Sequence, residues 1–205
     1  MARPRFHRLD ETQQQAILDA ALTEFAARGF ADASLNRIIE SAGISKGSMY
    51  YYFDGKEDLY AHVIRDRLEA VIERDGPFPV PEERDPEGFW TVLAGYYLRL
   101  MRALMGDPQT AALLRGWLAG AGTPSLGAAA REAEQRMLPW LMQTLSTGQR
   151  IGAVRTDLAP ELILGAVMGL GQAIDVWLIS NPPADAVLED AVSTVMDLIR
   201  RVVAP

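Results

Sequence analysis

A single glycine between two short amphipathic segments constrains the fold of this chain more than any other feature. Before it, apolar residues recur at the spacing of one helix face, namely Leu35, Ile38, Ile39 and Ala42. Gly43 stands where a helix end favours a left-handed residue, and Ser45 can cap a second helix over residues 46–53. Met49 and Phe53, four residues apart, mark the buried side of that helix. The pattern predicts a helix-turn-helix, a unit that binds in the major groove of duplex DNA.

The outward side of the second helix is small, polar and aromatic. At about 100° per residue, the residues that face away from the buried side or flank it are Gly47, Ser48, Tyr50, Tyr51 and Tyr52, with Lys46 in the first turn. Such residues can approach base edges and phosphate oxygens. Three consecutive tyrosines are equally typical of the edge of an aromatic core, so both interpretations stay open.

A further helix is predicted directly after this unit. The run Asp54-Gly55-Lys56-Glu57 has the form of a capping box. Lys56 in the first turn, beside exposed backbone N–H groups, would make an anion site suited to a phosphate. An ordinary surface lysine is the alternative.

Residues 12–65 resemble the N-terminal domain of the TetR family of transcriptional regulators. The matching residues are Phe25, Gly29, Phe30, Ser34, Leu35, Ile38, Ala42, Gly43, Ile44, Ser45, Lys46, Gly47, Ser48, Tyr50, Phe53, Lys56 and Leu59. The resemblance implies phosphate and base contacts at Ser34, Asn36, Lys46, Gly47, Ser48, Tyr50, Tyr51, Tyr52 and Lys56. Ile39 departs from the family, which commonly has alanine there, and a bulkier side chain can tilt the recognition helix.

The charge balance does not by itself indicate a nucleic-acid-binding protein. The chain carries a net charge of −7, and residues 1–65 hold 8 Lys and Arg against 9 Asp and Glu. The cations that we expect on the DNA side are Arg3, Arg5, Arg8, Arg28, Arg37, Lys46 and Lys56. Residues 1–8 contain three arginines and no acid, so they can form a mobile arm along the DNA backbone or minor groove. An unstructured tail without a role is the alternative.

The rest of the chain is predicted to be helical, with prolines between the helices. Asp10 and Gln13 can cap a first helix that buries Ile17, Leu18, Ala21 and Phe25, and residues 59–73 form a long helix. Further helices are expected over 86–105, 108–119, 125–148, 160–180 and 185–203, with no strand. The predicted fold is all-α, with a three-helix helix-turn-helix domain and its arm over residues 1–58 and a larger helical effector-binding and dimerisation domain over 59–205.

Composition narrows the class of protein. The chain has no cysteine, which removes disulfides, thiol nucleophiles and thiolate metal sites. Its first residues have no apolar stretch behind their positive charges, so we expect a cytoplasmic protein without a signal peptide. The apolar stretch from Leu162 to Ile179 is interrupted by Gln172 and Asp175, and a buried helix suits it better than a membrane span.

The last two predicted helices favour a homodimer. Gly165, Gly169 and Ala173 are spaced four apart, so another helix can approach closely. The last helix has a wide apolar face formed by Val187, Ala191, Thr194, Val195, Leu198, Ile199 and Val202. We expect two helices from each subunit to form a four-helix interface, as the TetR resemblance also implies. Burial of this face within the monomer is the alternative.

Large, soft side chains are abundant in the middle helices. They can line an adaptable apolar cavity or fill a solid core, and the family resemblance favours a cavity. The candidate ligand-binding residues are Trp90, Tyr97, Met101, Met105, Trp117, Met137, Trp140, Met168 and Gln172. Asp175 is a further polar group that could orient a ligand or face a dimer partner.

The expected function is a ligand-responsive transcriptional regulator, with repression preferred and activation left open as an alternative. It would bind a palindromic double-stranded DNA operator as a homodimer and leave it when a small, largely apolar effector binds. The alternative is a DNA-binding protein without an effector. An enzyme acting on an apolar substrate is disfavoured because neither His7 nor His62 adjoins a nucleophile motif. We expect no catalytic residues, no cofactor, no metal and no membrane partner.

Overall fold

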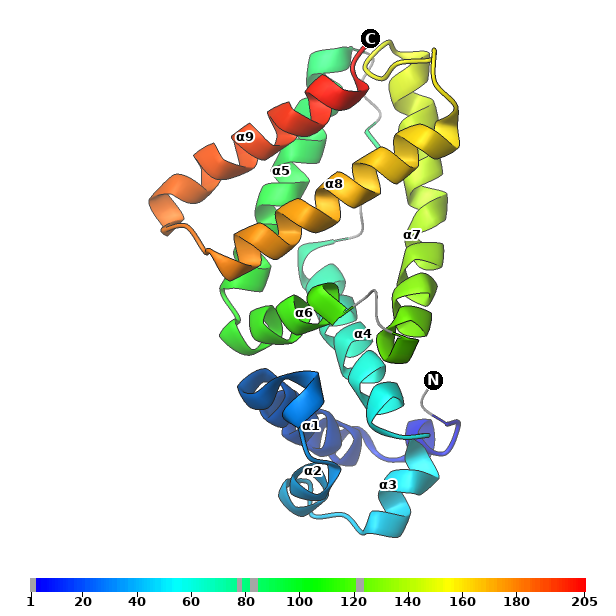
Figure 1. Cartoon of the computed structure of the whole chain (residues 1–205), viewed down its shortest axis with the longest axis vertical. Helices are drawn as coiled ribbons and strands as arrows, with labels where there is room; N and C mark the ends of the chain where they lie inside the picture. Colours follow the sequence, from blue (N-terminus) through cyan, green and yellow to red (C-terminus); the bar gives the residue numbers. More distant parts are fainter. Residues whose placement is uncertain (1–2, 77–78, 82–84, 121–123) are drawn as a thin grey trace. The chain divides into compact units, whose positions relative to one another are not determined.

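The computed structural model describes residues 3–76, 79–81, 85–120 and 124–205. Over these ranges the chain forms nine α-helices and a short 3-10 helix without any strand, which confirms the predicted all-α fold (Figure 1). The elements are η1 (Phe6–Arg8), α1 (Glu11–Asp32), α2 (Leu35–Ser41), α3 (Lys46–Tyr52), α4 (Lys56–Asp75), α5 (Pro86–Met105), α6 (Pro108–Gly120), α7 (Pro124–Arg150), α8 (Pro160–Ser180) and α9 (Asp185–Val203).

Aspartate caps and prolines determine where several helices begin. Asp10 accepts a hydrogen bond from the backbone N–H of Gln13 at 2.8 Å, as predicted for α1. Asp85 accepts one from Gly88 at 2.8 Å, with Pro86 in the first turn of α5. Pro160 likewise stands in the first turn of α8. The predicted bounds of α5, α8 and α9 are confirmed. The bounds of α6 and α7 differ from the predicted ones by a residue or two.

The chain forms two compact units. The first comprises Met1–Val71 and Asp107–Ala130, and the second comprises Ile72–Gly106 and Arg131–Pro205. The predicted domain boundary after residue 58 stays a prediction. Because α4 and α7 each run across a unit boundary, both contribute residues to both units.

The core of the first unit packs around α1, which contacts α6. The apolar face predicted for α1 is buried, as expected for Ile17, Leu18, Ala21 and Phe25. The ring of Tyr60 on α4 lies 4.8 Å from that of Phe25, and its hydroxyl donates to the carbonyl of Leu113 at 3.0 Å. Burial raises the pKa of Tyr60 to about 12, so the hydroxyl stays protonated as a donor.

The core of the second unit gathers residues of α5, α7, α8 and α9, together with the turn after α7. Its buried members are Phe89, Trp90, Leu145, Ala153, Val154, Ile163, Leu164 and Val203. In this unit α9 lies beside α5 and α8 (Figure 1). An ion pair between Arg200 and Glu87 also joins α9 to the start of α5.

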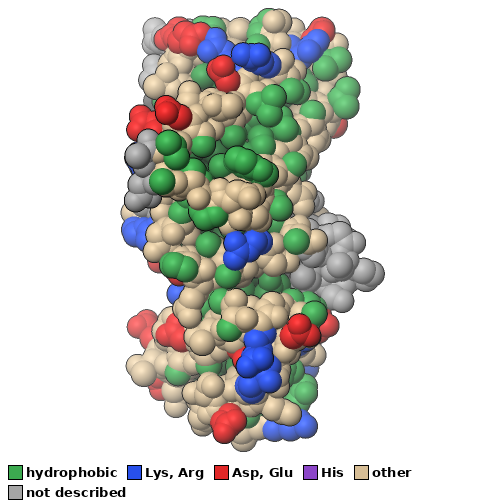
Figure 2. Space-filling model, turned by 60° about the vertical axis from the view of Figure 1, so that its left-hand side comes forward, with side chains coloured by type: hydrophobic (Ala, Val, Ile, Leu, Met, Phe, Trp, Pro, Cys, Tyr) green, Lys and Arg blue, Asp and Glu red, His purple; other side chains and the backbone are tan. Residues whose placement is uncertain are grey.

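Helix α8 is apolar but largely uncovered within the single chain. By length and composition this helix could cross a bilayer. Only 22% of its apolar stretch is buried inside the structure. The expectation of a buried helix is therefore wrong for the isolated chain. Among the residues whose burial is described, Leu162 and Trp177 are the most exposed large hydrophobic ones, each at 59%. Figure 2 shows hydrophobic side chains gathered on one face of the second unit.

The close approach at Gly148 provides a test of packing in the second unit. A Cβ atom at this position would lie 2.6 Å from Val154 Cγ2 and 2.9 Å from Phe89 Cζ, both of which are buried. We expect Gly148→Ala to lower the free energy of unfolding by about 1–3 kcal/mol through overpacking. Gly95→Ala on α5 is the control, because its Cβ would meet only Arg99 at 3.8 Å. Urea unfolding of both variants and of the wild type measures the change in the free energy of unfolding. Equal losses in the two variants would contradict the close packing of Gly148 against Val154 and Phe89.

Candidate nucleic-acid interface

The turn before α3 has the geometry predicted from the sequence. Gly43 has a φ of 64°, in the left-handed region that a residue with a side chain rarely adopts. Ser45 accepts a hydrogen bond from the backbone N–H of Ser48 at 3.0 Å and so caps α3. Met49 and Phe53 are buried, as is Ile38 of α2. The turn, the cap and the buried side of the predicted helix-turn-helix are thereby confirmed.

The opposite side of α3 faces solvent. Tyr50 and Tyr51 are each 47% exposed, Lys46 and Gly47 are exposed, and Ser48 and Tyr52 are half-buried. Tyr50 and Tyr51 therefore do not form the edge of a closed core, whereas Tyr52 packs beside the buried Phe6. A Cβ at Gly47 would contact only the hydroxyl of Ser45, at 3.7 Å. The backbone at Gly47 is thus open to a large partner.

The start of α2 is tied to α1 through Glu24. The backbone N–H of Ser34 donates to this carboxylate at 2.8 Å, and Arg37 forms an ion pair with it at 2.5 Å. Hydrogen bonding by Arg37 holds the pKa of Glu24 below its usual range. Arg28 lies 3.8 Å from the same carboxylate. Asn36 is exposed, whereas the backbone of Ser34 and both arginines already have partners inside the chain.

Lys56 stabilises the end of α1. Its ammonium donates to the carbonyls of Ala31 at 2.9 Å and Ala33 at 3.1 Å, and it lies 4.9 Å from the ring of Phe30. Lys56 thus binds carbonyls that the helix end leaves unpaired. Its role as a phosphate ligand stays a prediction.

The capping box predicted after α3 is wrong in its register. The side chain that accepts from the backbone N–H of Asp54 is Asp58, at 3.0 Å, instead of Glu57. Gly55, the residue directly before α4, has a φ of 153°.

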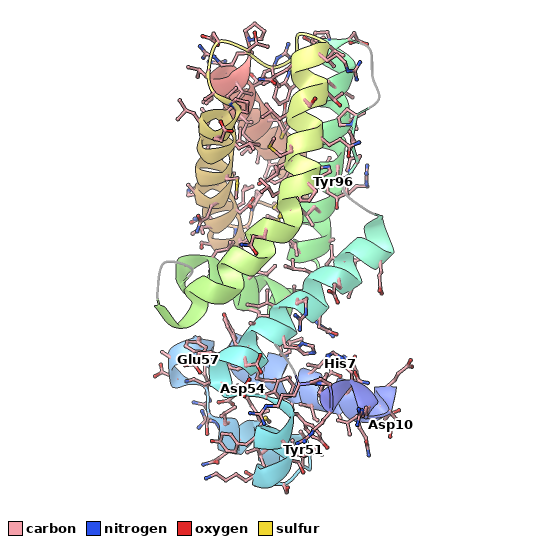
Figure 3. All side chains as sticks on the ribbon, turned by 90° about the vertical axis from the view of Figure 1, so that its right-hand side faces the viewer. His7, Asp10, Tyr51, Asp54, Glu57 and Tyr96 are labelled. Atoms are coloured by element: carbon pink, nitrogen blue, oxygen red, sulfur yellow. The ribbon has the colours of Figure 1, made fainter. Side chains whose placement is uncertain are left out.

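The N-terminal segment, residues 3–8, is folded, so the predicted mobile arm is wrong for these residues. Phe6 is 1% exposed, and its ring lies 4.9 Å from that of Phe53. The backbone N–H of Arg3 donates to the carbonyl of Tyr52 at 2.9 Å. The Arg3 guanidinium donates to the carbonyl of Tyr50 at 3.1 Å and pairs with Asp54. The Arg5 guanidinium lies 4.1 Å from the centre of the Tyr51 ring. Figure 3 labels Tyr51 and Asp54.

A histidine pair beneath this segment has a packing role that the sequence did not reveal. The ring of His62 is buried 5.0 Å from that of Phe6 and 5.7 Å from those of Phe53 and His7. Burial, reinforced by the positive charge of Arg65 and by His7, lowers the pKa of His62 to about 4. His62 is therefore neutral near pH 7. An apolar Phe6 among charged neighbours was the one sequence signal of this contact.

The residues predicted to bind a ligand lie in both units. Trp117 belongs to the first unit, and the other eight belong to the second. Trp90 and Met101 are buried, Tyr97, Met105, Trp140 and Met168 are half-buried, and Met137 and Gln172 are exposed. A hollow of about 340 Å³ in the second unit lies elsewhere, lined by Gln149, Gly152, Val154, Arg155, Thr156, Asp157 and Pro205. The predicted ligand pocket stays a prediction.

A half-buried polar pair includes one of these ligand candidates, Tyr97. The hydroxyl of Tyr97 on α5 donates to the carboxylate of Asp175 on α8 at 2.6 Å. Burial raises the pKa of Asp175 to about 6, and burial together with this carboxylate raises the pKa of Tyr97 above its ordinary value. A carboxylate inside an apolar region favours either a proton or a donor partner. Across the residues that the structure covers, no cluster of three or more His, Asp or Glu side chains could hold a metal ion.

Comparison with known proteins finds a family model that matches this part of the chain. The sequence model described as "Bacterial regulatory proteins, tetR family" matches residues 17–63. The HTH-type transcriptional regulator SrpR of Pseudomonas putida is 40% identical over 67 residues, which are 33% of this chain and 31% of SrpR. The chain thus spans less than a third of SrpR.

Solved structures resemble the chain over nearly its whole length. The transcriptional regulator FadR of Bacillus subtilis, in complex with stearoyl-CoA, has a TM-score of 0.71 at 22% identity and covers 90% of this chain and 96% of its own. A TetR-family regulator from Shewanella sp. PV-4 has a TM-score of 0.70 at 19% identity, covering 95% of this chain and 100% of its own. Residues 17–63 thus match the TetR-family model, and the fold of the chain is similar to that of solved TetR-family regulators.

Proposed function

We propose that this protein is a transcriptional repressor of the cytoplasm that binds a palindromic DNA operator as a homodimer and is released by a small, largely apolar effector. The observation that carries the proposal is the solvent-facing side of α3, with Lys46, Gly47, Tyr50 and Tyr51 exposed on a helix whose other side is buried. A short helix held by tertiary packing, with a polar and aromatic outer side, suits insertion into a major groove.

The exposed apolar surface supports the homodimer. On α8 and α9 the exposed large hydrophobic residues are Leu162, Trp177, Val187, Leu198 and Val202. A Cβ atom at Gly165 or Gly169 would meet nothing within 4 Å, so a second helix has room to approach. A four-helix interface of α8 and α9 from two copies would cover this face. The two recognition helices would then read half-sites roughly 34–36 Å apart, one turn of B-DNA.

Release by an effector would follow from thermodynamic linkage. An effector that favours one arrangement of the second unit changes the affinity for DNA if that arrangement misplaces the two recognition helices. α4 (Lys56–Asp75) contributes to both units and is the candidate element for transmission. Coupling of about 1–3 kcal/mol is typical of such systems.

Two other functions are less well supported. A DNA-binding protein without an effector would have the same α3 surface but a filled second unit. An enzyme is disfavoured because His62 is buried among aromatic rings, away from any nucleophile motif. A membrane could also cover α8, but the Tyr97–Asp175 pair and Gln172 interrupt that helix with polar groups.

Selection of bound duplexes from random DNA tests the function directly. We expect a palindromic consensus. Lys46→Ala should weaken binding of all sequences about tenfold and lower the slope of log K against log salt by about 0.9, because one phosphate contact is lost. Arg150 is an exposed cation of the second unit. Arg150→Ala should therefore change neither the affinity for DNA nor the salt slope. The absence of any enriched duplex would refute the proposed function.

The dimer is tested by introducing a charge into the proposed interface. Trp177→Glu should raise the dissociation constant of the dimer at least tenfold, because a carboxylate in an apolar interface is left unpaired. Met142→Glu is the control, since this exposed residue lies on α7, outside the proposed interface. Light scattering at micromolar concentration measures the masses. A monomeric wild-type protein would contradict the proposal.

The effector is tested by screening apolar compounds, with long-chain acyl-CoA as the first probe. A true effector should raise the melting temperature and weaken operator binding roughly 5–150-fold. Tyr97→Phe should alter this response, because it removes the hydroxyl that binds Asp175. Tyr96→Phe on the same helix is the control. An apolar panel that changes neither melting nor operator affinity would favour a regulator without an effector.

A further inference from the structure

The N-terminal segment closes the C-terminal end of the recognition helix. Two carbonyls in the last turn of α3, those of Tyr50 and Tyr52, accept hydrogen bonds from the side chain and backbone of Arg3. The last carbonyls of a helix have no partner within the helix, and a cation near them is favourable. Asp54, just past the end of α3, holds the same guanidinium through an ion pair. Arg3 therefore fixes the end of α3 from outside the helix-turn-helix.

An apolar anchor keeps this segment in place. Phe6 is buried and lies 6.3 Å from the ring of Tyr52 as well as against Phe53 and His62. The backbone N–H of Leu9 caps the short helix η1 by donating to the carbonyl oxygen of Phe6 at 3.0 Å. Residues on both sides of Arg5 are thus fixed. Little backbone entropy remains to be lost there when a partner binds.

Arg5 is presented to solvent on the face of α3 that would meet DNA. Its guanidinium lies 4.1 Å from the centre of the Tyr51 ring, in the range of a cation–π contact, and both residues are exposed. When a guanidinium stacks on an aromatic ring, the N–H groups in its own plane stay free to bind an anion. Arginine matches the two oxygens of a phosphate particularly well.

Most other cations near this surface already have partners inside the chain. Those engaged by carboxylates or carbonyls are Arg3, Arg28, Arg37 and Lys56. In the part of the chain that the structure describes, Arg5 and Lys46 have no carboxylate partner. Lys46 lies at the first residue of α3, and Arg5 is held at Tyr51 near the last. Arg5 and Lys46, two cations without a carboxylate partner, therefore lie at opposite ends of the exposed side of α3.

We propose that Arg5, held over Tyr51 by the N-terminal segment, binds a DNA backbone phosphate beside the major groove, and that Arg3 is the positioning residue for this end of α3. This inference rests on the proposed DNA-binding function. It assigns the Tyr51 ring a role in placing Arg5, besides any contact made by its hydroxyl. The N-terminal segment becomes part of the DNA-binding surface outside the helix-turn-helix.

The test uses the full chain and the duplex selected by the wild-type protein, with affinity measured at several salt concentrations. Arg5→Ala should weaken binding about tenfold and lower the salt slope by about 0.9, while melting at nearly the wild-type temperature. Arg5→Lys should keep the slope but bind less tightly, since it retains charge and loses the planar fork. Arg150→Ala is again the matched control.

A double-mutant cycle tests the role of the Tyr51 ring. In a Tyr51→Ala background, Arg5→Ala should cost less than half of its effect in the wild type, whereas in Tyr51→Phe it should keep its full effect. Arg5→Ala binding like the control, with an unchanged salt slope, would overturn the phosphate contact. Additive effects of Arg5→Ala and Tyr51→Ala would overturn the placement by Tyr51. Failure of the wild-type protein to bind any duplex would instead refute the proposed function itself.

Discussion

The burial of Phe53 is the contact on which the candidate interface depends. α3 has seven residues, too few for a helix to persist in water without tertiary packing. Phe53, at its C-terminal end, is fully buried and meets Phe6 of the N-terminal segment and His62 of α4. One aromatic side chain thereby joins three parts of the first unit. The outward side of α3 can be exposed and polar because its inner side is held so firmly.

Charge in the first unit serves mainly to hold its own helices together. Glu24 gathers Ser34, Arg28 and Arg37, while Lys56 closes the end of α1. A protein with a net charge of −7 has few cations to spare for an anionic partner. Affinity for DNA would then depend on a small number of well-placed groups, and discrimination on the shape and hydroxyls of α3. Such a surface would bind non-cognate DNA weakly.

Local signals made most of the fold predictable, and long-range contacts account for what was missed. The bounds of α5 and α8 follow from Pro86 and Pro160 at their first positions. Gly43 and Ser45 likewise act on their immediate neighbours. By contrast, Lys56 binds carbonyls 25 and 23 residues away, and Tyr97 binds a carboxylate 78 residues away. No spacing rule encodes such partners. The N-terminal segment was misjudged because its arginines are visible in the sequence, whereas the site that receives Phe6 exists only after folding.

The bare apolar side of α8 has a consequence for how the protein accumulates. If a second copy covers Trp177 and Leu162, dilution separates the subunits and also returns this surface to water. Folding, assembly and occupancy of DNA then form one coupled equilibrium, and occupancy rises with the square of the subunit concentration when dimers are scarce. Newly made chains would stay inactive below a threshold abundance and act sharply above it.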